Sequence, residues 1–115
     1  MYKQHTFCKN IIIKELKNHI DNLTKAINLI GVNDKEFLYQ YTKERDFYNK
    51  VLEMVSKDNI ITSNVERVIN MKIDEYSEMK KNKTILPSYE YRLKLLIVSK
   101  LYLLNIKKIY SNIDF

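Results

Sequence analysis

Aliphatic residues between positions 13 and 30 follow one another at alternating intervals of three and four residues. The six are Ile13, Leu16, Ile20, Leu23, Ile27 and Ile30. This spacing places all of them on one side of an α-helix, with mostly polar residues at the positions between. Gly31 is the only glycine in the chain, and it stands where the left-handed residue after a helix end is expected. The pattern predicts a helix over residues 7–30.

Two further helices are predicted from paired polar residues that can cap a helix start. Asn33 precedes Glu36 by three residues, and Ser63 precedes Glu66 by the same interval. In such a pair the first side chain accepts a hydrogen bond from a free backbone N–H of the helix. The glutamate side chain accepts one from the backbone N–H of the first residue. Apolar residues at helical spacing follow both pairs. The sequence therefore predicts helices over residues 33–56 and 63–82.

A fourth helix is predicted over residues 88–112. Pro87 is the only proline and is expected in the connector, because proline disrupts a helix interior. Ser88 can then cap the helix. Four helices joined by short connections are typical of an all-α, up-down-up-down four-helix bundle, so residues 1–115 are expected to form a single helical domain.

The positive charge of the chain is concentrated at its C-terminal end. The net charge is +6, and residues 80–115 account for all of it. The predicted basic surface comprises Lys80, Lys81, Lys83, Arg92, Lys100 and Lys107, together with Lys94 and Lys108. Lysine outnumbers arginine 17 to 3, which also fits the codon usage of a low-GC genome. The uneven placement of charge indicates an acidic partner or a nucleic acid more strongly than the total does.

The helix predicted over 88–112 has more apolar surface than one packed face requires. Its inward face is expected to comprise Tyr91, Leu95, Val98, Tyr102, Ile106, Ile109 and Ile113, and to be extended by Leu96, Leu103 and Tyr110. Ile97, Leu101 and Leu104 remain on the opposite side, bordered by Lys94 and Lys108. Either a neighbouring helix or the N-terminal segment covers these three residues, or they bind a second copy of the chain or another protein. Lysines on both sides of the helix disfavour contact with a membrane surface, and no apolar run is long enough to span a bilayer.

The helix predicted over 33–56 has a charged residue at its middle layer. Depending on how the helix is turned, this residue is Glu44 or Arg45. A buried charge there would fix the helix register through a paired charge. The alternative is that both residues lie at the edge of the packed face, with the arginine head in water.

The sequence contains no pattern that predicts catalysis, a cofactor or a metal site. Cys8 and His19 are about 16 Å apart along a helix, too far to share a zinc ion. His19 is expected to pair with Glu15 on the surface, one helical turn away. One cysteine and the absence of an apolar leader predict a cytoplasmic protein.

These observations predict a protein that acts by binding rather than by catalysis. In size, charge and helix pattern the chain is similar, in class and not in motif, to small basic helical bundles among bacteriocin immunity proteins and phage-encoded inhibitors. That similarity implies a regulator, inhibitor or adaptor, including phage, plasmid or viral accessory proteins. The expected partner is another protein or a second copy, bound at Ile97, Leu101 and Leu104. The alternative is a nucleic-acid-binding accessory protein that uses the basic surface of residues 80–115.

Overall fold

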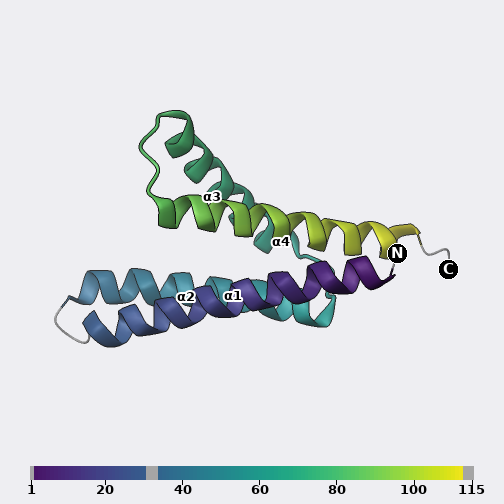
Figure 1. Ribbon diagram of the computed structural model, residues 1–115, viewed down its shortest axis with the longest axis horizontal. Helices are drawn as coiled ribbons and strands as arrows, with labels where there is room; N and C mark the ends of the chain where they lie inside the picture. Colours follow the sequence, from purple (N-terminus) through teal and green to yellow (C-terminus); the bar gives the residue numbers. More distant parts are fainter. Residues whose placement is uncertain (1, 31–33, 113–115) are drawn as a thin grey trace. The chain divides into compact units, whose positions relative to one another are not determined.

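A computed structural model describes residues 2–30 and 34–112. These residues form four α-helices and no strand (Figure 1). The helices are α1 (Tyr2–Ile30), α2 (Lys35–Lys57), α3 (Ser63–Lys81) and α4 (Pro87–Asn112). The prediction of an all-α chain with four helices is confirmed, and the helices pair in chain order as in an up-down-up-down arrangement. The chain divides into two compact units, Met1–Ser56 and Lys57–Phe115.

The first unit is the hairpin of α1 and α2, which run side by side in opposite directions (Figure 1). Its best-defined contact joins the His19 ring of α1 to the Tyr48 ring of α2, edge to face, with centroids 4.4 Å apart. Phe47 meets Tyr48 in a second edge-to-face contact at 5.3 Å. Aromatic rings prefer this geometry because the positive ring edge meets the negative ring face. The contact of His19 with Tyr48 therefore joins the two helices, and the contact of Phe47 with Tyr48 lies within α2.

The buried face of α1 differs from the predicted one. Leu16 and Leu23 are buried as expected, but within residues 9–30 the other buried positions are Ile12 and His19. The remaining four members of the predicted stripe are only partly buried: Ile13, Ile20, Ile27 and Ile30. The prediction that His19 lies on the surface was wrong. The helix is rotated about its axis so that His19 contacts Tyr48. The spacing of apolar residues alone could not predict this contact, because histidine is polar.

Asp34 caps α2. Its carboxylate oxygen Oδ1 accepts a hydrogen bond from the Phe37 N–H at 3.2 Å, and its carbonyl accepts one from Leu38 at 3.0 Å. Aspartate favours this position because its side chain satisfies a free N–H and its charge suits the positive end of the helix dipole. The predicted cap Asn33 and the predicted turn residue Gly31 lie outside the described residues.

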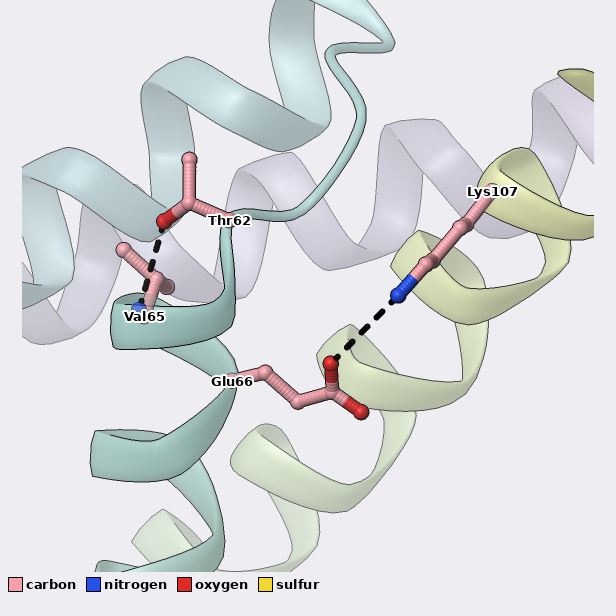
Figure 2. A network of polar contacts seen from close by, with 4 residues as sticks. All are labelled: Thr62, Val65, Glu66 and Lys107. Atoms are coloured by element: carbon pink, nitrogen blue, oxygen red, sulfur yellow. Dashed lines mark hydrogen bonds and ion pairs between the residues drawn. The ribbon is translucent and has the colours of Figure 1, made fainter.

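The second unit is the hairpin of α3 and α4, and its contacts show that these helices run in opposite directions. Close to the α3–α4 turn, Tyr76 stacks on Tyr89 at 5.5 Å. At the other end Glu66, in the first turn of α3, pairs with Lys107 of α4 (Figure 2). Early residues of α3 therefore contact late residues of α4, and late residues contact early ones.

Thr62 caps α3. The Val65 N–H donates to the Thr62 hydroxyl at 3.3 Å (Figure 2). The predicted cap, Ser63, is instead the first helical residue. The prediction chose Ser63 because Glu66 completes a capping box with it, but Glu66 pairs with Lys107. The cap position was therefore wrong by one residue.

The end of α3 forms a Schellman turn without glycine. The Thr84 N–H donates to the Met79 carbonyl at 2.9 Å, and the Lys83 N–H donates to the Lys80 carbonyl at 3.1 Å. This turn requires a left-handed residue at its corner, usually glycine. Lys83 occupies the corner with φ of 58°. Lys83, which belongs to the predicted basic surface, thus also adopts a strained backbone conformation.

Pro87 is the first residue of α4, so the expectation that it lies outside the helix was wrong. The Tyr89 and Glu90 N–H groups donate to the Leu86 carbonyl, each at 3.0 Å. Proline is favoured at the first helical position because its missing N–H would have no partner there. Ser88, the predicted cap, consequently lies inside the helix.

Candidate interaction surface

The buried face of α4 is turned relative to the predicted one. It consists of Leu93, Leu95, Leu96, Ser99, Tyr102, Leu103 and Ile106. Tyr91, Val98 and Ile109 were expected to face inward, but all three are exposed. Leu95, Leu96 and Leu103 are buried as predicted, whereas Leu93 is buried in addition and the small Ser99 takes the place of Val98 in the packed face. Leucine burial stabilises by about 2 kcal/mol per side chain, which outweighs the cost of one buried hydroxyl.

Three apolar residues of α4 form what we call the outward strip: Ile97, Leu101 and Leu104. Leu101 is 61% exposed, Ile97 is 38% exposed and Leu104 is half-buried. Exposed Val98 widens the strip on one side. Intervals of three and four residues keep the strip on one line along the helix. The structure therefore places apolar side chains in water along this line.

Lys94 and Lys108 lie at the two ends of the outward strip. They precede and follow Leu101 by seven residues each, so all three share one line on the helix surface. Both lysines are exposed, and neither makes an ion pair within the described part of the chain. The apolar strip is thus bounded by cations along the helix axis.

Much of the predicted basic surface is engaged inside the second unit. Lys80 Nζ lies 3.5 Å from a Glu90 oxygen, and Lys107 Nζ lies 3.9 Å from a Glu66 oxygen. The Arg92 guanidinium lies over the Tyr89 ring, 5.0 Å from its centroid.

Three further members of the basic surface form no side-chain ion pair with the described residues. Lys81 and Lys83 are exposed at the end of α3, and Lys100 is half-buried in α4. The predicted basic residues are thus divided between the end of α3 and the length of α4.

A hydrogen bond between distant residues was not predicted from the sequence. The Tyr102 hydroxyl of α4 donates to Oδ1 of Asp58, just after α2. Asp58 has a left-handed backbone with φ of 52°, which aspartate tolerates better than most residues. Burial is the main reason that the pKa of Tyr102 is raised above its ordinary value, and the bond to Asp58 adds to the effect. Patterns of neighbouring residues could not predict this bond, because its two residues are 44 positions apart in the chain.

Glu44 and Arg45 are both half-buried in α2. Neither lies in the fully buried layer of that helix, which consists of Tyr48, Val51 and Val55. The structure thus favours the alternative in which both charges lie at the edge of the packed face.

The described residues contain neither a metal-binding cluster nor a membrane-spanning helix. Within 2–30 and 34–112, no three His, Cys, Asp or Glu side chains are arranged to hold a metal ion. In the same ranges, none of the helices combines the length and the apolar character needed to cross a bilayer. Comparisons with protein-family models, curated proteins and solved structures found no match.

Proposed function

We propose that this chain is a non-enzymatic helical module that binds another protein through the outward strip of α4. The observation that supports the proposal most is the exposure of Leu101 at the centre of an apolar line. Exposed apolar residues are common when they are scattered, but a continuous line along a helix fits a groove or a second helix. A regulator, inhibitor or adaptor of cytoplasmic origin is the class of protein that fits.

The strip resembles a short coiled-coil seam. Lys94, Ile97, Leu101, Leu104 and Lys108 follow the alternating intervals of a heptad repeat. A partner helix would place apolar side chains between those of the strip. The lysines at both ends would then select acidic residues on the partner. Affinity would come from the apolar centre, and orientation would come from the charges.

The proposal is tested by comparing two aspartate variants as bait for proteins from the source cells. Leu101→Asp places a charge in the strip, whereas Met71→Asp places one at an equally exposed site on α3, also 61% exposed. A partner that binds the strip is retained by wild type and by Met71→Asp but lost with Leu101→Asp. Equal capture by all three baits would contradict the proposal.

The nucleic-acid alternative has less support. Tyr89 lies among the basic residues of α4 and could stack on a base, but its ring already contacts Tyr76 and Arg92. Lys80 and Lys107 have carboxylate partners. Retention on heparin separates the two functions, because phosphate binding falls steeply with salt. Changing Lys80, Lys81 and Lys83 together to Glu would abolish such retention under the alternative and would leave partner capture unchanged under the proposal.

A further inference from the structure

The outward face of α4 has opposite charges at its two ends, so it is complementary to a second copy that runs in the opposite direction. Glu90 lies one helical turn before Lys94, and Lys108 lies at the far end, with the outward strip between them. The face therefore begins with an acid and ends with a base. Two copies placed in opposite directions would bring the acid of each copy to the base of the other.

We propose that the outward strip pairs with a second copy of this chain, with the two α4 helices antiparallel. This inference rests on the proposed function, because it names the partner of the same strip. In the register that fits, Glu90 lies opposite Lys108 of the second copy. Ile97 lies opposite Leu101 of the second copy, and Leu104 packs against the stem of its Lys94. A two-fold axis passing beside residue 99 relates the copies, so each contact occurs twice.

The same charges disfavour a parallel pair. In a parallel pair each residue of the seam meets its own copy. Glu90 would then face Glu90, and both Lys94 and Lys108 would face lysines. Like charges held opposite one another destabilise a helix pair. The order of charges therefore selects the antiparallel direction.

Glu90 is able to accept a second cation. Its contact with Lys80 is 3.5 Å long, and the two side chains remain 38% and 56% exposed. An exposed pair of this kind contributes little stability, and a carboxylate has room for more than one donor. Lys108 is exposed at the other end of the face. Neither group has to leave a buried partner when the dimer forms.

The dimer is expected to be weak. The face from Glu90 to Lys108 spans about 27 Å of helix, and its apolar centre has only three residues on each copy. Interfaces of this size are typical of transient complexes. Half-buried Lys100 borders the face and approaches its own copy, which weakens the pair further. Dissociation constants in the micromolar range or above are expected.

Sedimentation equilibrium from low micromolar to near-millimolar concentration tests the pairing. Wild type and Met71→Asp are expected to shift from monomer to dimer, and Leu101→Asp is expected to stay monomeric. A dimer that persists in Leu101→Asp would overturn the inference, because another surface would then hold it. A wild type that stays monomeric throughout would also overturn it.

The thermal stability of Leu101→Asp separates the failure of this inference from the failure of the proposed function. If wild type is monomeric and the variant unfolds at the wild-type temperature, the strip is free and the proposed function stands. If the variant unfolds at a much lower temperature than Met71→Asp, the strip belongs to the core and both proposals fail.

Charge-swap variants test the register. Glu90→Lys and Lys108→Glu are each expected to weaken the dimer about tenfold, because two exposed pairs become repulsive. The double variant Glu90→Lys/Lys108→Glu is expected to recover the wild-type constant. In a parallel pair the single variants would not weaken the dimer, because each like-charge pair would only exchange its sign. Lys81→Glu, with the same charge change outside the face, is the matched control and should dimerise as wild type does.

An equimolar mixture of the two single variants supplies a second measurement. Lysine at 90 on one chain then meets glutamate at 108 on the other, and the reverse pair is also complementary. The mixture is expected to form heterodimers more tightly than either variant forms homodimers. A mixture that associates no better than its components would overturn the register. Circular dichroism of each variant shows whether Glu90→Lys, which also breaks the Lys80 pair, remains folded.

Discussion

The Tyr102 hydroxyl donates a hydrogen bond to the Asp58 carboxylate across 44 residues of sequence. Tyr102 is buried in α4, and Asp58 occupies the left-handed position after α2. The bond therefore ties the start of the second unit to the middle of its last helix. The bond holds the first residue of the α2–α3 connection against α4.

Removing the Tyr102 hydroxyl is expected to destabilise the second unit. Tyr102→Phe keeps the ring and its packing but leaves Asp58 without this donor. A hydrogen bond to a charged group contributes about 1.5–3 kcal/mol, and the half-buried Asp58 regains some solvation, so a loss of about 1–2 kcal/mol is expected. Urea unfolding measures it. Tyr91→Phe, at an exposed position in the same helix, is the control, and an equal loss in both variants would contradict the assigned role.

The same pair predicts how stability changes at alkaline pH. Burial, together with Asp58, raises the folded-state pKa of Tyr102 above the unfolded value of about 10. A raised pKa stabilises the fold fully below the unfolded pKa, and that contribution is lost as the pH rises from 10 toward the folded pKa. Over this range the free energy of unfolding should fall by about 1.4 kcal/mol per pH unit more in wild type than in Tyr102→Phe. Parallel curves for the two proteins would contradict the prediction.

Glycine at position 83 is expected to stabilise the chain. Lys83 has a positive φ at the corner of the Schellman turn, which costs a residue with a side chain about 1 kcal/mol. Lys83→Gly should therefore raise the free energy of unfolding by up to about 1 kcal/mol. Lys81→Gly removes the same charge at the last residue of α3 and should lower the free energy of unfolding, by less than the roughly 1 kcal/mol of a helix interior. If both variants are destabilised, Lys83 does not occupy the corner.

The cap of α3 is tested by neighbouring alanine variants. Thr62→Ala removes the hydroxyl that accepts from Val65, and a loss of about 1 kcal/mol is expected. Ser63→Ala should change stability by less than half as much, because Ser63 is already helical. Thermal unfolding followed by circular dichroism gives both values. A larger loss for Ser63→Ala than for Thr62→Ala would contradict this assignment and would support Ser63 as the cap.

The helices of this chain could be predicted from sequence because their signals are local. Apolar spacing and the turn residues located all four helices, with boundaries that differ from the structure by one or two residues for α2, α3 and α4. Only α1 begins five residues earlier than predicted. The sequence left open whether Ile97 and Leu101 are covered by another segment, and both are exposed in the structure.

The turn of each helix about its axis could not be predicted, because it depends on contacts with another segment. In α1 the edge-to-face contact with Tyr48 brings His19 inward. In α4 the packed face includes Leu93 and Ser99, which were not predicted to face inward, and leaves Val98 exposed. The ion pairs of Lys80 and Lys107 could not be predicted either, since their carboxylate partners are distant in sequence. Charge counts along the chain do not register such pairs.

The central claim is that the outward strip of α4 is open in the folded monomer. The most direct test compares the unfolding free energies of Leu101→Asp and Met71→Asp at a concentration too low for self-association. Both residues are 61% exposed, so both variants are expected to lie within about 0.5 kcal/mol of wild type. A loss of about 3 kcal/mol or more in Leu101→Asp alone would show that the strip is buried in the monomer, and would contradict the account.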